Sequence, residues 1–129
     1  MSTSTEQKFY ICRICGNLVG MIHDAGPEII CCGQPMEALV VNTEEASVEK
    51  HLPVISVNGD KISVVVGSVL HPMVDAHYLP WIYLETKNGG QRKNLVPGDE
   101  PKAVFSVVDD EAVAVYAYCN LHGLWKTAL

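Results

Sequence analysis

The chain carries short apolar runs that are separated by turn-forming residues. Residues 54–57 and 62–66 are rich in Val and Ile and lie on either side of Asn58-Gly59-Asp60. An Asn-Gly pair between two such runs is the strongest short sequence signal for a two-stranded antiparallel hairpin. The pattern therefore predicts a β-hairpin at this point of the chain.

Further apolar runs follow at similar spacing. Residues 81–86 and 91–96 flank a second turn, Asn88-Gly89-Gly90, and residues 103–108 and 112–118 flank an acidic turn. No window of about a dozen residues has the apolar period of an amphipathic helix, because the candidates are broken by Gly or Pro or are β-branched throughout. Six or seven short strands over about eighty residues predict an antiparallel β-sandwich.

The first part of the chain follows a different pattern. Four of the five cysteines lie in it, whereas four of the five histidines lie further on, together with Cys119. Residues 41–47 form a polar stretch without apolar alternation, which is typical of a short linker. We therefore expect two domains, residues 1–42 and residues 43–129.

Size and charge exclude several classes of protein. The chain has 129 residues, which is enough for a core that needs no disulfides, and 15 acidic against 9 basic side chains give a net charge of −6. This balance argues against nucleic acid as a partner. No apolar run approaches the roughly 20 residues of a membrane span or the apolar core of a signal peptide. We therefore expect no membrane partner, a cytoplasmic location and reduced thiols.

Cys12 and Cys15 form a Cys-x-x-Cys pair, and the adjacent Cys31 and Cys32 follow after fifteen intervening residues. Two thiolate pairs at this spacing can close a tetrahedral metal site with metal–sulfur bonds of about 2.3 Å. Because two of the ligands are consecutive, we expect a distorted tetrahedron. Iron and zinc both suit four thiolates, so a zinc-stabilised interaction module stays open, and disulfides are a less favoured alternative in a reducing compartment.

A second set of metal-binding side chains is scattered over the predicted sandwich. We expect the first of its members on a strand, the next two in one loop, and the thiol at the end of another strand. Loops at one end of a sandwich can bring such residues together. The set comprises His51, His71, His77, Cys119 and His122.

This second set has more ligands than structural zinc uses, and it suits iron or copper. The main alternative is a cupredoxin-like electron-transfer site, which uses two histidines, one cysteine and a weak axial methionine, for which Met73 is available. That site leaves two histidines without a role.

Several segments resemble desulfoferrodoxin, a superoxide reductase family with an N-terminal desulforedoxin-like iron module. The resemblance runs from about residue 9 to residue 126. It implies an all-β protein in which a small rubredoxin-type metal module precedes an immunoglobulin-like antiparallel β-sandwich. The segments are CRICGNLVG, IICCGQPM, VEKHLPVI, GSVLHPMVDAHYLPWI and YCNLHGLWK.

The resemblance also implies a chemistry for particular residues. Two mononuclear iron ions would bind each chain, one at the four N-terminal cysteines and one at the second set, with the four histidines equatorial and Cys119 axial. Glu49 corresponds to the carboxylate that occupies the sixth position of the oxidised iron, and Lys50 to the cation beside the open position. The implied reaction is the one-electron reduction of superoxide to hydrogen peroxide in a homodimer, with rubredoxin as a donor.

Overall fold

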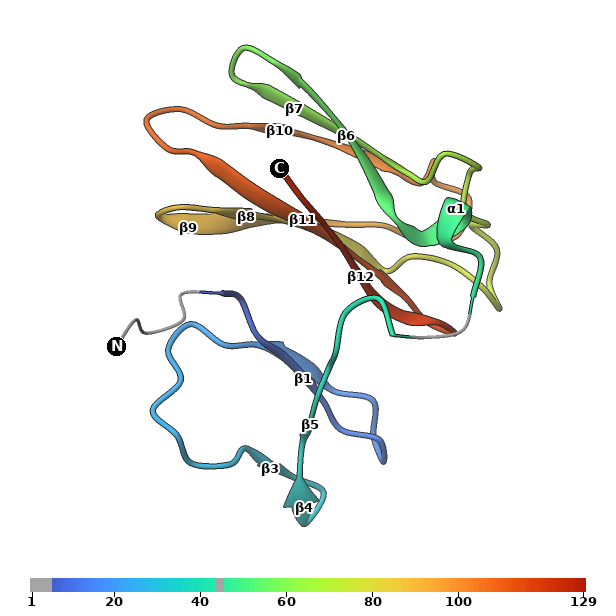
Figure 1. Cartoon of the computed structure of the whole chain (residues 1–129). Helices are drawn as coiled ribbons and strands as arrows, with labels where there is room; N and C mark the ends of the chain where they lie inside the picture. Colours follow the sequence, from blue (N-terminus) through green and yellow to red (C-terminus); the bar gives the residue numbers. More distant parts are fainter. Residues whose placement is uncertain (1–5, 44–45) are drawn as a thin grey trace. The chain divides into compact units, whose positions relative to one another are not determined.

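The computed structural model describes residues 6–43 and 46–129 (Figure 1). The chain divides into two compact units, Met1–Val40 and Val41–Leu129. The predicted linker at 41–47 includes residues 44 and 45, which lie outside the described residues, as do the first five residues of the predicted domain 1–42. No helix in the described part of the chain is long and apolar enough to cross a membrane.

The first unit consists of very short strands. β1 (Phe9–Ile11) pairs antiparallel with both β2 (Leu18–Gly20) and β5 (Glu37–Ala38), while β3 (Ile30–Cys31) and β4 (Gln34–Pro35) form a separate hairpin. From residue 6 onward, its buried apolar residues are few, and they are Phe9, Ile11, Cys12 and Met36. A core this small gives little stability by itself, which is typical of a module held together by a metal.

The second unit contains two antiparallel sheets and one short helix, α1 (Val48–His51). The first sheet has the order β10-β7-β6 and the second has the order β12-β11-β8-β9. The strands are β6 (Pro53–Asn58), β7 (Lys61–Val66), β8 (Trp81–Thr86), β9 (Gly89–Asn94), β10 (Lys102–Ser106), β11 (Ala112–Cys119) and β12 (Gly123–Ala128).

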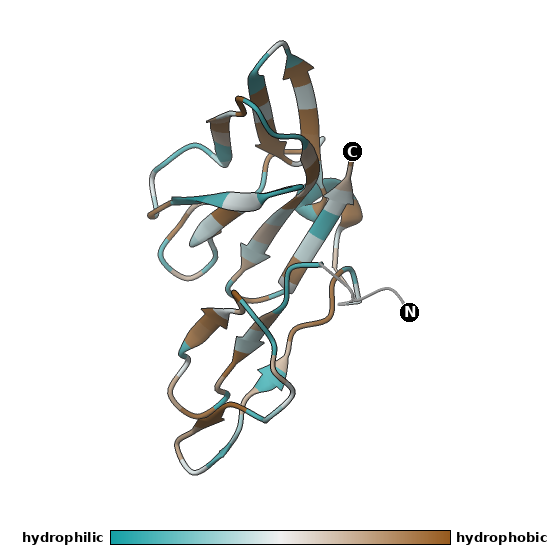
Figure 2. Cartoon of the chain, turned by 90° about the vertical axis from the view of Figure 1, so that its left-hand side faces the viewer, coloured by the Kyte–Doolittle hydropathy of each residue, from teal (hydrophilic) through white to brown (hydrophobic). Residues whose placement is uncertain are grey.

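The hydrophobic core lies between these two sheets. Alternate residues of β7 and β10 point into it, since side chains along a strand face opposite sides of the sheet. Figure 2 shows apolar positions along the strands of this unit. The core residues include Ile62, Val64, Val66, Leu79, Ile82, Leu84, Phe105, Val115, Ala117 and Cys119. Cys119 is thus part of the packed interior and does not sit on a mobile surface.

The predicted sandwich is confirmed, with four differences in detail. The turn of the first hairpin is Gly59-Asp60, because Asn58 is the last residue of β6. The turn of the second hairpin is at Lys87 and Asn88, and Gly89 already pairs with Thr86 as the first residue of β9. The strand β12 was not predicted individually. His51 was expected on a strand, which is wrong, because it is the last residue of α1.

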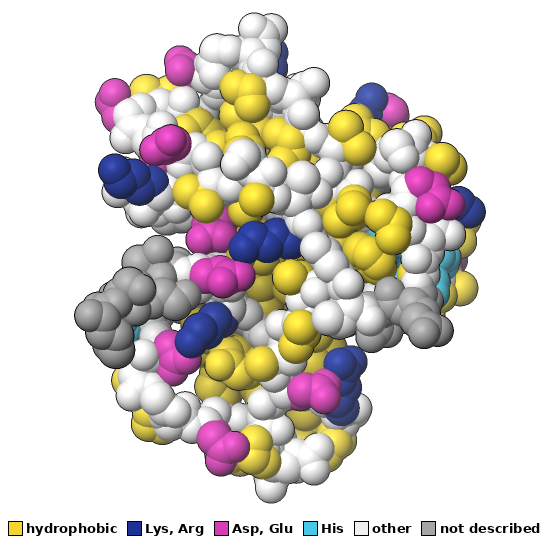
Figure 3. All heavy atoms as spheres, viewed as in Figure 1, with side chains coloured by type: hydrophobic (Ala, Val, Ile, Leu, Met, Phe, Trp, Pro, Cys, Tyr) yellow, Lys and Arg dark blue, Asp and Glu magenta, His cyan; other side chains and the backbone are white. Residues whose placement is uncertain are grey.

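An apolar groove of about 830 Å³ lies beside α1 on the second unit. It is lined mainly by residues of α1, β6 and the end of β12, including Val48, Val54 and Leu129. Figure 3 shows hydrophobic side chains on the face of this unit that carries β6 and α1. The groove accounts for several of the large exposed apolar side chains, Val54 and Val57 among them.

Candidate metal centres

The structure brings all five candidate ligands of the second unit to one end of the sandwich. His51 is the last residue of α1, and His71 and His77 lie in the loop that joins β7 to β8. Cys119 is the last residue of β11, and His122 lies in the turn before β12. Residues far apart in the sequence therefore meet because one strand end, the turn that follows it, one helix end and one loop converge.

The four imidazole rings form a nearly square arrangement. Neighbouring ring centroids are 4.8 Å apart for His51 and His71, 4.7 Å for His71 and His77, 5.1 Å for His77 and His122, and 5.0 Å for His122 and His51. Neighbouring rings are 74–87° apart in orientation, and the diagonal from His51 to His77 is 6.3 Å. Four rings at the corners of a square are the arrangement that four equatorial nitrogen ligands require.

Hydrogen bonds determine which ring nitrogens face the centre of this square. Nδ1 of His51 lies 2.7 Å from the Ser47 carbonyl oxygen, and Nδ1 of His71 lies 2.7 Å from the Pro72 carbonyl oxygen. A carbonyl can only accept, so each Nδ1 carries the proton and each Nε2 has a free lone pair. Nε2 of His51 and Nε2 of His77 are both buried and have no hydrogen-bond partner among the residues that the structure describes. Such orphaned nitrogens are costly unless they bind something, and a metal ion is the group that fits.

Cys119 supplies the fifth donor. Its side chain is fully buried, and its Sγ lies 3.3 Å from Nε2 of His71 and 3.8 Å from Nδ1 of His122. One donor atom each from His51, His77, Cys119 and His122 lies within 4.8 Å of the others. The sulfur therefore approaches the imidazole square from the protein interior, while His77 and His122 are half-buried at its outer side.

Burial controls the protonation of these ligands. It lowers the pKa of His71 to about 4, and it lowers the pKa values of His51 and His77 as well. All three imidazoles are therefore neutral near pH 7, which is the form that binds metals. Burial raises the pKa of the Cys119 thiol, although hydrogen bonds from the backbone of Leu121 and His122 oppose this shift. A cation at the centre would favour the thiolate.

The two residues that precede His51 lie at the rim of the site. Glu49 is exposed and Lys50 is half-buried. The Lys50 charge contributes to the lowered pKa values of both His51 and His77, whereas the Glu49 charge opposes the lowering at His51. A cation and a carboxylate therefore both act on the histidine cluster.

Gly67 holds the helix that carries these residues. The N–H of Val69 donates to the Glu49 carbonyl oxygen at 2.9 Å, so the chain after β7 runs directly against α1. A Cβ on Gly67 would lie 2.6 Å from the Glu49 carbonyl oxygen and 2.9 Å from that of Leu52. Only glycine permits this close approach of two backbones.

Trp125 supports the ligands from the core side. Its indole stacks on the His51 ring at a centroid distance of 5.0 Å, and its Nε1 donates to the His122 carbonyl oxygen at 3.0 Å. Neither Gly67 nor Trp125 was predicted from the sequence as part of the site. The signals were present as a glycine directly after an apolar strand and a tryptophan three residues beyond His122.

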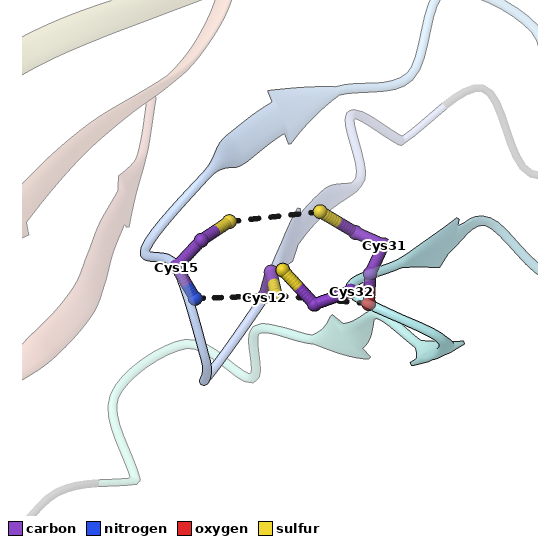
Figure 4. A group of neighbouring side chains, drawn as sticks. All are labelled: Cys12, Cys15, Cys31 and Cys32. Carbon is purple, nitrogen blue, oxygen red and sulfur yellow. Dashed lines mark hydrogen bonds between the residues drawn. The ribbon is translucent and has the colours of Figure 1, made fainter.

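The four cysteines of the first unit also gather around one point (Figure 4). Their sulfurs lie within 4.8 Å of one another, and those of Cys15 and Cys31 are 3.6 Å apart. Sulfurs at the corners of a tetrahedron with 2.3 Å bonds are separated by about 3.8 Å, so the cluster has the size of a four-sulfur metal site. None of the five cysteines, all of which lie in the described part of the chain, forms a disulfide in the structure.

Local backbone geometry explains how the adjacent pair reaches the same point as Cys12 and Cys15. Cys32 has φ = 53° and Gly33 has φ = 77°, so the chain turns sharply at the second pair. This left-handed conformation is uncommon for a residue with a side chain. The strained cysteine is consistent with the distortion expected from consecutive ligands.

Hydrogen bonds shift the pKa values of Cys12 and Cys32 in opposite directions. The backbone N–H of Cys15 donates to the sulfur of Cys12 at 3.5 Å and lowers the pKa of Cys12 to about 6. Hydrogen bonding with the Cys15 thiol raises the pKa of Cys32 to about 12. Several like-charged thiolates this close together cannot all ionise without a cation, so the cluster also fits a metal ion.

Met73, the candidate axial ligand of the cupredoxin-like alternative, has another role. Its sulfur accepts a hydrogen bond from the N–H of Leu79 at 3.5 Å, and its side chain packs against the core. The structure gathers four histidines and not two. Both observations count against a cupredoxin-like site.

Comparison with known proteins gives matches along almost the whole chain. The family model described as "Desulfoferrodoxin" matches residues 43–128, and the model described as "Desulfoferrodoxin, N-terminal domain" matches residues 4–39. A "Desulfoferrodoxin homolog" of Archaeoglobus fulgidus is 48% identical over 118 residues, which cover 92% of this chain and 94% of that relative. A "Desulfoferrodoxin" of Nitratidesulfovibrio vulgaris is 42% identical over 121 residues, which cover 94% of this chain and 95% of that relative.

A solved structure resembles the chain over a similar length. The crystal structure of the superoxide reductase from Treponema pallidum matches with a TM-score of 0.80 and 38% sequence identity. The match covers 95% of this chain and 98% of that chain. The likeness therefore extends over both units.

Proposed function

The chain belongs to the desulfoferrodoxin family and is a superoxide reductase, and we propose that the reaction takes place at the four-histidine, one-cysteine cluster of the second unit. We assign the metal ligands as His51, His71, His77, Cys119 and His122. The observation that carries this assignment is the square of four imidazoles with a buried thiol at its interior side. Five donors in this arrangement leave one coordination position free for a small ligand.

Iron bound there would supply one electron and an open coordination position to superoxide. The reaction balances when one superoxide takes up that electron and two protons to give one hydrogen peroxide. Neutral imidazoles and one thiolate leave a positive charge on a divalent ion, which favours binding of an anion. The carbonyl partners of Nδ1 fix the ring orientations of His51 and His71, so Nε2 of each would be available to hold the ion.

Lys50 addresses a conflict that the net charge creates. Superoxide is an anion and the protein carries a net charge of −6, so the protein as a whole repels its substrate. The half-buried Lys50 ammonium next to His51 places a positive charge at the rim of the site. A local cation can concentrate the anion there against the overall charge.

Glu49 has a different role in this proposal. Its carboxylate is exposed, and its charge acts on His51. We propose that it occupies the free position of the oxidised iron after the product has left. It would then stabilise the ferric state without taking part in the reduction of superoxide.

The four cysteines of the first unit hold the second iron ion in our proposal. Four thiolates fill a tetrahedral shell, so this centre cannot bind superoxide, and we assign it an electron-transfer or structural role. The enzyme also needs an external one-electron donor, for which we propose a rubredoxin. A homodimer and a cytoplasmic location remain proposals from the family resemblance and the sequence.

Metal analysis combined with the stoichiometry of the reaction tests this proposal. We expect two iron ions per chain and one hydrogen peroxide per superoxide consumed, with no oxygen released, when a reductant restores the iron. Copper would indicate a cupredoxin-like carrier, and zinc alone would indicate an interaction module. Release of oxygen would indicate dismutation and would contradict the proposed reduction.

A pair of variants locates the reaction. Cys119→Ala removes the buried fifth donor and should abolish reduction of superoxide, because the catalytic iron loses its thiolate. Cys15→Ser is the matched control, since it removes one sulfur from the other cluster. Both variants are reduced chemically before the reaction with superoxide, so that electron transfer from the four-cysteine centre is not needed. Equal loss of this reaction in both variants would contradict the assignment of the reaction to the second unit.

A further inference from the structure

We propose that Asn120 is a positioning residue for His77. Its side chain holds His77 in place by hydrogen bonding to the backbone of the residues immediately before and after that histidine. The inference rests on the proposed function, because it concerns one of the five ligands of the catalytic iron. Asn120 is exposed and follows Cys119 directly. Its position in the turn gave no indication of such a role in the sequence analysis.

The side-chain amide of Asn120 makes two hydrogen bonds to the His77 segment. Its Oδ1 accepts from the N–H of Tyr78 at 2.9 Å, and its Nδ2 donates to the carbonyl oxygen of Ala76 at 3.1 Å. The backbone N–H of Asn120 also donates to the Tyr78 carbonyl oxygen at 3.2 Å. The amide therefore pairs with the residues immediately before and after His77, much as a neighbouring strand would.

His77 depends on its backbone for orientation. The rings of His51 and His71 are each fixed by a hydrogen bond from Nδ1 to a backbone carbonyl. The backbone of His77 forms a two-way bridge with Val74, with both N···O distances at 3.0 Å. This bridge joins two residues of the same loop. Asn120 instead connects the loop to the segment that carries Cys119 and His122.

The connection is specific because it joins two segments that carry ligands. Residues 76–78 surround one histidine, and Asn120 lies between Cys119 and His122. The clamp therefore sets the position of His77 relative to the thiolate and to a second imidazole. Groups that orient the ligands of a metal typically change its affinity about 10- to 100-fold when they are removed.

The chemistry of the amide explains why asparagine is needed. The interaction requires an acceptor for the Tyr78 N–H and a donor for the Ala76 carbonyl, and a carboxamide of this length offers both. Aspartate keeps the acceptor but places a negative oxygen against the Ala76 carbonyl. Alanine removes both bonds, and the bond from the backbone N–H of residue 120 is then the one that remains of the three.

Iron release from the intact protein tests the inference, because each molecule carries its own control. In Asn120→Ala we expect a chelator to remove the iron of the His/Cys centre about tenfold faster than in the wild type. The absorption band of the thiolate-bound ferric iron should shift as well, while release from the four-cysteine centre stays unchanged. Asn120→Asp should change release and spectrum in the same direction. Asn94→Ala, which removes an exposed asparagine of β9 that contacts Arg92, should match the wild type.

Three outcomes separate the possibilities. Release and spectrum of Asn120→Ala equal to those of the wild type would overturn the inference and leave the proposed function intact. Equally accelerated release from both centres would also overturn it, because the effect would then be a general loss of stability. If Asn120→Ala does not fold, Asn120→Asp decides by the same criteria. A wild-type protein without iron at the His/Cys cluster would instead overturn the proposed function.

Discussion

Replacing Gly67 with alanine should disturb the catalytic centre although the side chain never touches a ligand. The new Cβ would lie 2.6 Å from the Glu49 carbonyl oxygen, 2.9 Å from the Leu52 carbonyl oxygen and 3.2 Å from the Lys50 carbonyl carbon. All three contacts are with backbone atoms, which cannot rotate away as a flexible side chain can. The segment that carries Glu49, Lys50 and His51 must therefore move by roughly 0.5 Å or more to restore ordinary contacts.

The expected cost follows from this displacement. Overpacking of a tight contact typically costs about 1–3 kcal/mol, partly offset by about 0.4–1 kcal/mol from the lower entropy of the unfolded chain. A loss of 1 kcal/mol lowers the melting temperature of a domain of this size by about 4–8 °C. Since His51 moves with its helix, we also expect about a tenfold loss in the rate of superoxide reduction.

Gly89→Ala is the matched control. No atom lies within 4 Å of a Cβ built on Gly89, and its backbone conformation is open to residues with a side chain. Urea unfolding and pulse radiolysis of both variants give the comparison, with Gly89→Ala within about 0.5 kcal/mol of the wild type. If Gly67→Ala had the same stability and the same rate of superoxide reduction as Gly89→Ala, the reasoning would be refuted.

Four further predictions follow from the two metal centres. Lys50→Ala should lower the second-order rate constant with superoxide about tenfold at low salt and flatten its dependence on ionic strength, because a local attraction is lost; an unchanged salt dependence in pulse radiolysis would contradict this. Glu49→Ala should alter the optical spectrum of the oxidised protein and leave turnover within about twofold; an unaltered ferric spectrum would count against its role as a ligand. In Cys15→Ser, metal analysis should show that the iron of the four-cysteine centre is lost. The chemically reduced catalytic iron should still react with superoxide at the wild-type rate. Loss of that reaction would show that the four-cysteine centre is needed for it. The metal-free protein should lose stability as the pH falls from about 6.5 to about 4, because the pKa of His71 is 6.5 in the unfolded chain and about 4 in the folded one, so the unfolded chain binds more protons. Urea unfolding at several pH values measures this loss, and a flat profile would contradict the buried state of His71.

Local signals in the sequence predicted the parts of the fold that depend on neighbouring residues. The hairpin of β6 and β7 forms where it was expected, because the turn chemistry and the apolar runs act within a few residues, but its turn is Gly59-Asp60 and Asn58 still pairs with Lys61. The helix that ends at His51 has only four residues, which is too short to produce a helical period. The strand β12 follows a short turn, and neither Gly123 nor Lys126 is typical of a strand.

Residue types also indicated which side chains could bind metal, but not how they would be arranged. The spacing of Cys12 and Cys15 is itself a local signal, whereas the square of imidazoles forms only when the ends of both sheets meet. The close approach at Gly67 and the amide bonds of Asn120 join segments far apart in the chain. Such contacts depend on how distant segments pack together, so the pattern of residues within one strand cannot predict them.

The two clusters differ in how much of the chain each needs before it can form. The four cysteines lie between positions 12 and 32, inside a unit that makes its own contacts, whereas the His/Cys cluster needs residues from position 51 to position 122. Closing a long loop costs more entropy and takes longer than closing a short one. During synthesis on the ribosome, the first site can therefore capture its metal while the sandwich is still emerging. The proposed catalytic site would load only after the last hairpin has formed, so, if both centres take iron as we propose, a shortage of iron late in maturation would leave molecules with one filled centre and no activity.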